Sequence, residues 1–227
     1  MMPATCLPNN CFCESIRPVG IAQPSDTWSS AAFIILGILV LAIATADRKK
    51  SANLKNFSPY GMFYGLLMVL VGLGSMYYHA RLNFLGQFLD NFGMYLIISA
   101  IFFYRITNFI KIKSWLILSY YVLTNIFLGI IQYIYPETRR YLFALGVIIV
   151  LFIEYQIHKH RQVLPNKNFL YSAIGLFALG FAVWIADITK IFCLPNSLLQ
   201  GHALWHILTA LSALFMFLFY RSEAEPA

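Results

Sequence analysis

Residues 26–46 read DTWSSAAFIILGILVLAIATA, and no charged side chain follows Asp26 within this stretch. A bilayer hydrocarbon core about 30 Å thick is crossed by about 20 apolar residues in a helix. Similar runs, separated by polar breaks, recur at 60–79, 85–104, 115–135, 140–157, 169–188 and 202–220. The sequence therefore predicts an all-α, polytopic membrane protein with a bundle of seven transmembrane helices.

The overall composition agrees with this interpretation. Hydrophobic residues make up 60% of the 227 residues and charged residues only 11%, less than half the charge density of an ordinary soluble domain. Connections between the runs are short, so we expect a single domain over residues 1–227, with an extramembrane segment at 1–24 and a short tail at 221–227. The first 24 residues lack a basic stretch followed by an apolar run, which argues against a cleaved signal peptide.

The basic residues predict an orientation in the membrane. One set of connections carries most of them: Arg48, Lys49, Lys50, Lys55, Arg105, Lys111, Lys113, Lys159, Arg161, Lys167 and Arg221. The opposite set has Arg17, Arg81, Arg139, Arg140 and Lys190. By the positive-inside rule the N-terminus faces outward and the C-terminus faces the cytoplasm. The net charge of +7 is thereby explained without a nucleic-acid partner.

Five ionisable residues in the predicted spans fall at one membrane depth. His79 closes the second span, Asp90 lies in the first turns of the third, Asp187 lies near the end of the sixth, and His202 and His206 open the seventh. An ionisable side chain inside a membrane costs several kcal/mol and therefore requires a functional or structural reason. The predicted topology places all five toward the outer face, where they indicate a polar site.

The spacing of the histidines points to a metal. His202 and His206 are four residues apart, so both imidazoles lie on one helical face about one turn from each other. His79 can supply a third nitrogen, and three imidazoles with one open position are typical of catalytic zinc. Two alternatives remain open at this point, a hydrogen-bonded polar network that holds helices together and a proton path.

Other polar residues are less informative. Ser75 lies one turn before His79 and faces the same way, although serine in a membrane helix often bonds a carbonyl of the preceding turn. We expect Glu154 to snorkel to the cytoplasmic interface, with a role in proton relay as the alternative. His158 and His160 adjoin Lys159 and Arg161, so we expect solvated surface side chains.

Several motifs together resemble the alkaline ceramidases, a family within a superfamily of seven-helix metal-dependent hydrolases that also includes the adiponectin receptors. They are Gly74–His79, Asp90, Trp184–Asp187, Cys193, His202–Thr209, Cys13-Glu14 and Gln23–Ser29. The resemblance implies zinc bound by His79, His202 and His206, with Ser75 and Asp90 beside the metal-bound water. It also implies hydrolysis of the amide of ceramide-like N-acyl lipids.

The mechanism expected from this resemblance gives each residue a role. Asp90 would accept a proton from the attacking water and return it to the leaving amine, while Ser75 would help to stabilise the oxyanion. Asp187 is expected to support a ligand histidine or the helix packing. The resemblance further implies a disulfide between Cys13 and Cys193, and the topology places both cysteines on the outer face. Cys6 and Cys11 remain unassigned.

One feature of the family is poorly matched. Its eukaryotic members have a calcium site around the N-terminal segment, and only Glu14 clearly fits that pattern. Cys11, Ile16 and Gln23 occupy positions where the pattern has acidic or amide ligands. Calcium takes six to eight oxygen ligands, so these departures argue against calcium regulation and leave Glu14 as a vestigial ligand.

The expected substrate is a membrane lipid whose amide lies at headgroup level, and no obligatory protein partner is predicted. The protein would reside in the plasma or inner membrane of a bacterium, or in the endomembranes of a eukaryote, with its active site toward the outer or lumenal face. Two other functions remain as alternatives. One is a receptor or sensor with a structural metal, and the other is a proton-coupled transporter.

Overall fold

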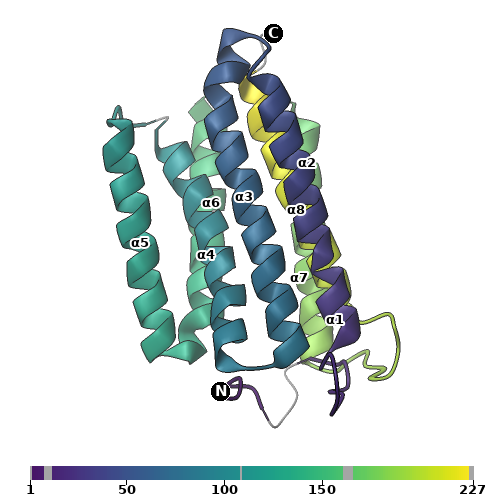
Figure 1. The fold of residues 1–227 in the computed structure, drawn as a ribbon. Helices are drawn as coiled ribbons and strands as arrows, with labels where there is room; N and C mark the ends of the chain where they lie inside the picture. The colour runs from purple at the N-terminus through teal and green to yellow at the C-terminus, as the bar shows by residue number, and fades with distance from the viewer. Residues whose placement is uncertain (1, 8–11, 108, 161–165, 225–227) are drawn as a thin grey trace. The chain divides into compact units, whose positions relative to one another are not determined.

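The computed structural model describes residues 2–7, 12–107, 109–160 and 166–224. Within these ranges the chain is helical and forms no extended strand (Figure 1). The elements are α1 (Pro24–Ser29), α2 (Ala31–Asp47), α3 (Ala52–Arg81), α4 (Phe84–Ile106), α5 (Ser114–Ile134), the 3-10 turn η1 (Pro136–Thr138), α6 (Arg139–His160), α7 (Lys167–Ile188) and α8 (Gly201–Ala224). Cys11, Arg161 and the side chain of His160 lie outside the described residues.

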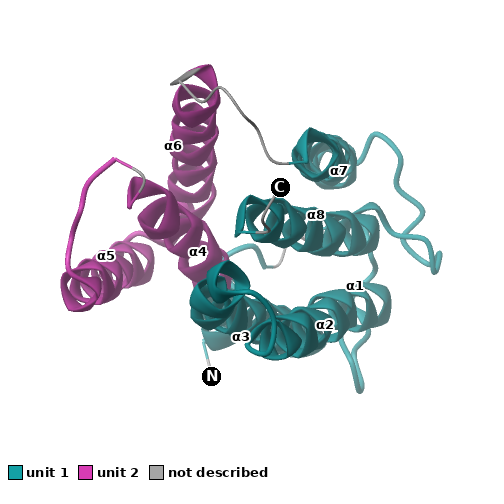
Figure 2. Ribbon diagram, turned by 90° about the horizontal axis from the view of Figure 1, so that it is seen from above, with its two compact units in different colours: residues 1–90, 165–227 teal, residues 91–164 magenta. Residues whose placement is uncertain are grey.

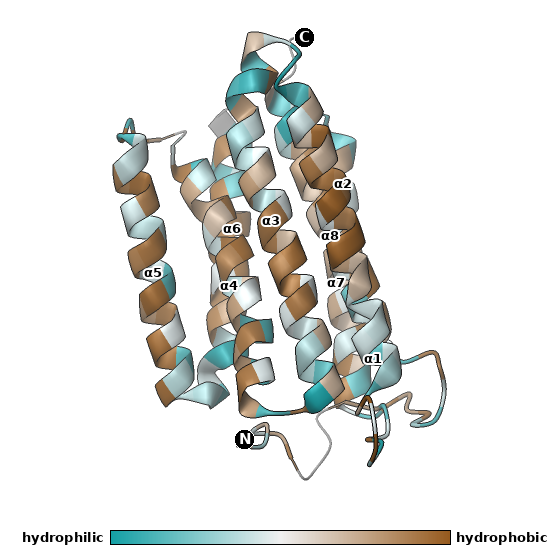
Figure 3. Cartoon of the chain, in the orientation of Figure 1, coloured by the Kyte–Doolittle hydropathy of each residue, from teal (hydrophilic) through white to brown (hydrophobic). Residues whose placement is uncertain are grey.

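Seven segments in these ranges are long and apolar enough to cross a membrane, which confirms the predicted fold class. The first combines α1 and α2 into one span, Pro24–Asp47. Figure 3 shows apolar residues along the middle of the helices and polar residues at their ends. The largest difference between predicted and observed spans is at α3, which was predicted over 60–79. The helix begins earlier, at Ala52, because Ser51 caps it by accepting a hydrogen bond from the Leu54 N–H at 3.4 Å. Hydropathy misses this first part because it is polar.

The helices group into two compact units (Figure 2). Unit 1 comprises residues 1–90 and 165–227, and therefore α1, α2, α3, α7, α8 and the first turns of α4. Unit 2 comprises residues 91–164, with the rest of α4, α5, η1 and α6. A single domain over the whole chain stays a prediction.

Small residues allow close helix packing in unit 1. A Cβ atom on Gly37 of α2 would lie 2.8 Å from the Gly65 carbonyl oxygen of α3, which leaves no room for a side chain. Between α7 and α8, the Ser212 hydroxyl donates to the Ala173 carbonyl at 2.7 Å. Small residues and interhelical hydrogen bonds of this kind are the usual basis of helix association in membranes. They hold α2 against α3 and α7 against α8, and the Tyr64 hydroxyl of α3 donates to the Ala213 carbonyl of α8 at 3.1 Å.

The two ends of unit 1 carry different polar groups. At one end Asp47, the last residue of α2, accepts hydrogen bonds from the Arg221 guanidinium of α8 at 2.8 and 2.9 Å. The Lys50 ammonium lies 3.2 Å from the same carboxylate. The opposite end contains the start of α1, the end of α3 and the start of α8 (Figure 1). His79, in the last turn of α3, and His202 and His206, in the first turns of α8, lie at this end.

In unit 2 the structure corrects the prediction for Glu154. Its side chain does not snorkel to the interface, because the residue is only 3% exposed and pairs with buried Arg105 of α4, Nε to Oε1 at 2.7 Å. A buried charge inside a membrane needs an opposite charge, and Arg105 supplies it. His158 is partly buried, with Nδ1 donating to the Glu154 carbonyl at 2.6 Å, so the prediction of a solvated surface residue was also wrong for His158.

Candidate metal centre

The three predicted histidines meet inside unit 1. His79 comes from the last turns of α3, His202 and His206 come from the first turns of α8, and all three are buried. One ligand atom from each residue can be chosen so that all lie within 4.8 Å of one another. The Nε2 atoms of His79 and His202 are 3.2 Å apart, close to the ~3.3 Å expected between ligand nitrogens on a tetrahedral zinc ion. The cluster therefore has dimensions suited to one metal ion.

Gln23 fixes which nitrogen of His79 carries the proton. The Gln23 Nε2 group donates to the Glu14 carbonyl at 3.2 Å, so the amide oxygen is the atom that faces His79. This Oε1 atom lies 3.0 Å from His79 Nδ1 and can only accept a hydrogen bond. Nδ1 is therefore protonated, and Nε2 presents its lone pair toward His202.

Two serines orient His206 in the same way. The hydroxyls of Ser29 and Ser30 donate to the Asp26 carbonyl at 3.0 and 2.8 Å. Both lie beside His206 Nδ1, at 2.9 and 3.3 Å. The Ser29 proton is directed to that carbonyl, and the Ser30 proton to the same carbonyl or to Ser75 Oγ at 3.1 Å, so both oxygens accept from Nδ1. The Nε2 lone pair of His206 is thus left free for a metal, on the side where Ser75 lies.

His202 is held through its backbone and through its ring. Asp187 at the end of α7 accepts from the His202 N–H at 3.1 Å and from the Cys13 N–H at 2.9 Å. The Phe12 ring stacks on the imidazole with centroids 3.8 Å apart. Asp187 therefore supports the site by anchoring the start of α8 and the N-terminal segment.

The disulfide implied by the family resemblance is present. Cys13 and Cys193 are bonded, with their Cα atoms 5.4 Å apart. This bond ties the N-terminal segment to the loop between α7 and α8, next to Phe12 and Asp187. Cys6 Sγ lies 3.2 Å from the Tyr78 hydroxyl.

The two predicted catalytic residues lie on either side of a close helix contact. The Ser75 hydroxyl is buried and lies 3.3 Å from His206 Nε2. A Cβ atom on the preceding residue, Gly74, would lie 2.9 Å from the Leu89 carbonyl oxygen and 3.2 Å from the Asp90 nitrogen. The backbone at Asp90 is therefore packed against α3 immediately before Ser75. Asp90 itself is half-buried.

Glu14 has a defined structural role. Its two carboxylate oxygens accept from the backbone N–H groups of Ser25 and Asp26, at 2.8 and 2.9 Å. These groups belong to the first turn of α1 and have no partner within the helix. Glu14 therefore caps α1, and its assignment as a vestigial calcium ligand stays a prediction.

Four residues beside the cluster had no predicted role there: Gln23, Asp26, Ser29 and Ser30. Asp26 is 0% exposed, and its carboxylate oxygens have no hydrogen-bond partner within the described part of the chain. One of these oxygens lies 3.8 Å from His79 Nδ1. An orphaned carboxylate beside one histidine of the cluster favours a cation there. The available signal was Asp26 itself, which we treated as the boundary of a span rather than as a charge within it.

The nearest loop also carries a positive charge. Lys190, just after α7, donates from Nζ to the Phe12 carbonyl. Desolvation lowers the pKa of Lys190 below its usual range, and the carboxylates of Asp187 and Asp26 act in the opposite direction. Lys190 thus contributes to the electrostatic balance of this end of unit 1.

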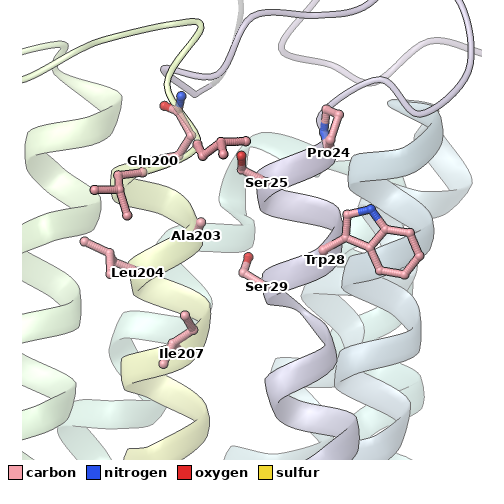
Figure 4. A pocket seen from close by; sticks show the side chains of 10 residues that line it. Pro24, Ser25, Trp28, Ser29, Gln200, Ala203, Leu204 and Ile207 are labelled. Atoms are coloured by element: carbon pink, nitrogen blue, oxygen red, sulfur yellow. The ribbon is translucent and has the colours of Figure 1, made fainter.

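A pocket of about 310 Å³ lies between α1 and α8 (Figure 4). Its lining is mainly apolar and includes Trp28, Ala203, Leu204 and Ile207. Ser29 also lines the pocket, and its hydroxyl contacts His206. The pocket and the histidine cluster therefore share one wall.

Comparisons with known proteins agree with this geometry. The family model for ceramidase matches residues 12–223. The chain is 23% identical over 202 residues to alkaline ceramidase 1 of Mus musculus, covering 85% of this chain and 70% of that protein. It is 30% identical over 172 residues to alkaline ceramidase 3 of Mus musculus, with 68% and 62% covered. It is 26% identical over 232 residues to the alkaline ceramidase of Drosophila melanogaster, with 90% and 74% covered. The chain belongs to the ceramidase family.

Proposed function

We propose that this protein is a zinc-dependent intramembrane hydrolase that cleaves the amide bond of ceramide-like N-acyl lipids and releases a fatty acid and an amine base. The observation that carries the proposal is the buried cluster of His79, His202 and His206, close enough to share one ion. The names of the relatives, all alkaline ceramidases, support the choice of substrate.

Zinc is the metal that best suits the donor set. Three neutral imidazoles with an open fourth position are a common catalytic zinc site. The hydrogen bonds that Gln23, Ser29 and Ser30 accept from Nδ1 of His79 and His206 favour the tautomers that such ligation requires. A bound zinc ion supplies a Lewis acid, which polarises the amide carbonyl and makes water acidic enough to attack near neutral pH.

Two residues of the chain complete the proposed mechanism. Asp90 accepts the proton of the attacking water and delivers it to the leaving amine. Ser75 donates its hydroxyl to the oxyanion that develops on the carbonyl oxygen. The support for these roles is that Ser75 Oγ lies 3.3 Å from a ligand nitrogen and that the Asp90 backbone packs beside the neighbouring Gly74.

The depth of the cluster favours a lipid substrate. His79 and His202 lie in the terminal turns of membrane-spanning helices, where the amide of a lipid would reside while its chains stay in hydrocarbon. The opposite end of unit 1 carries the basic residues Lys50 and Arg221. With basic loops on the cytoplasmic side, the active site would face outward or toward a lumen.

Hydrolysis by full-length protein in detergent tests this function. Wild type incubated with a panel of N-acyl lipids should release fatty acid and amine in equal amounts from ceramide. His202→Ala should lose this activity, whereas His158→Ala, a histidine of unit 2, should retain it. Release by His202→Ala at the wild-type rate would refute the proposed site, and the absence of release by wild type would refute the substrate class.

A further inference from the structure

Three carboxylates are buried around the histidine cluster, and they differ in how they are stabilised. Glu14 accepts two backbone N–H groups, and Asp187 accepts two others. Asp26 is equally buried, but its oxygens have no hydrogen-bond partner within the described residues. A carboxylate buried without hydrogen bonds or a counter-charge is strongly unfavourable. Lys190 acts electrostatically on Asp26, but its ammonium donates to the Phe12 carbonyl, so a positive charge in the histidine cluster would stabilise the Asp26 carboxylate further.

The side chain of Asp26 is directed toward a metal-ligand candidate. Its Oδ2 atom lies 3.8 Å from Nδ1 of His79, on the edge of the ring opposite to the nitrogen that faces His202. Gln23 Oε1 contacts the same Nδ1 at 3.0 Å. His79 therefore has two acceptors behind it, one neutral and one anionic.

We propose that Asp26 is a positioning residue whose negative charge balances the divalent ion on the histidine cluster and strengthens the binding of that ion through His79. The inference rests on the zinc site of the proposed function. A carboxylate behind a ligand histidine increases the basicity of the imidazole, and loss of such a partner commonly weakens metal binding about 10–100-fold. Gln23 holds the ring in place, while Asp26 supplies the charge.

This arrangement predicts two effects of opposite sign. Asp26→Asn keeps the size of the side chain and removes its charge, so the zinc complex should become weaker. In protein stripped of metal the same substitution removes a buried carboxylate that accepts no hydrogen bond within the described residues, so the stripped protein should become more stable. Substitution of a residue with only a structural role would not make the stripped protein more stable and at the same time weaken its affinity for zinc.

The experiment uses full-length protein in detergent, stripped with a chelator and titrated with zinc against a competing indicator. We expect Asp26→Asn to bind zinc about 10–100-fold more weakly than wild type, with the melting temperature of stripped protein raised by about 2 °C or more. Asp187→Asn is the matched control. Because Asp187 anchors two backbone N–H groups, its substitution should lower the melting temperature of stripped protein.

The inference would be overturned if Asp26→Asn bound zinc within about twofold of the wild-type affinity. It would also be overturned if this substitution lowered both the zinc affinity and the melting temperature of stripped protein. Asp26→Ser, a smaller uncharged residue, provides a second test if the first variant folds poorly, and a lowered melting temperature in both would also overturn it. Wild type that binds no zinc would contradict the proposed function as well. Equally tight zinc binding by wild type and Asp26→Asn would contradict the role of Asp26 and leave the proposed zinc site standing.

Discussion

Asp26 and Asp47 lie near the two ends of the same membrane span, Pro24–Asp47, and both are 0% exposed. Asp47 is bound by the Arg221 guanidinium at two atoms and lies beside Lys50. Asp26 lies beside His79 of the histidine cluster, and no group in the described chain donates a hydrogen bond to its carboxylate oxygens. At one end of unit 1 the chain binds the carboxylate directly with its own cations. At the other end Lys190 donates to the Phe12 carbonyl, and the orphaned carboxylate favours an additional charge from a bound ion.

This difference separates a structural end from a candidate catalytic end. Variants at the Asp47 end should change stability and leave metal binding intact. Variants at the histidine end should change metal binding or turnover, whatever their effect on stability.

The largest effect is expected at Asp90. Replacement by Asn removes the proposed proton acceptor, so kcat for ceramide hydrolysis should fall about 10²–10⁴-fold. Zinc content should remain as in wild type, because Asp90 is not a proposed ligand. Steady-state kinetics with metal analysis on one preparation measures both. Turnover at the wild-type rate would exclude Asp90 as the base.

Loss of the Cys13–Cys193 disulfide should affect both stability and the site. The paired substitution Cys13→Ser and Cys193→Ser should lower the free energy of unfolding by about 2–4 kcal/mol. Zinc affinity should also fall, because the bonded segment holds Phe12 against His202 and donates from the Cys13 N–H to Asp187. Denaturant titration and zinc titration measure the two effects, and unchanged zinc affinity would show that the segment does not support the cluster.

At the opposite end of the span, Arg221→Met should lower the free energy of unfolding by about 2 kcal/mol, because it leaves Asp47 with Lys50 alone. Zinc affinity should not change. The double variant Asp47→Asn with Arg221→Met should recover much of the lost stability, since the uncompensated charge is gone. A loss of zinc binding in Arg221→Met would contradict the separation of the two ends.

The smallest effect is expected at Gln23. Gln23→Leu removes the acceptor that keeps the proton on His79 Nδ1, so zinc affinity should fall about 10-fold. Gln23→Glu retains an acceptor oxygen and should bind zinc more tightly than Gln23→Leu. Competition with a chelator measures the zinc affinities of wild type, Gln23→Leu and Gln23→Glu. Equal affinities would show that Gln23 does not orient the ligand.

The sequence predicted the elements of this fold and the residues of the cluster, for physical reasons. Membrane spans are recognisable because about 20 residues must be apolar in each, and His202 and His206 share a face because of the helical period. His79 could be added because its span ends at the same depth. All three conclusions depend on local patterns or on hydropathy.

The surroundings of the cluster could not be predicted in this way. Gln23 reaches His79 because the N-terminal segment docks on the end of α3, through the backbone bonds Ala22 N–H to Ala80 O at 3.1 Å and Gln23 N–H to His79 O at 3.0 Å. No periodicity reveals such a contact between residues 56 positions apart. The pairing of Glu154 with Arg105, which corrected the expectation of snorkelling, is a similar long-range contact.

Metal analysis of purified full-length protein tests the central claim most directly, with His206→Ala and His158→Ala prepared in parallel without chelator. We expect about one zinc per chain in wild type and His158→Ala, and a large loss of zinc together with ceramide hydrolysis in His206→Ala. No metal in wild type, or equal zinc in wild type and His206→Ala, would contradict the proposal that these histidines form a catalytic zinc site.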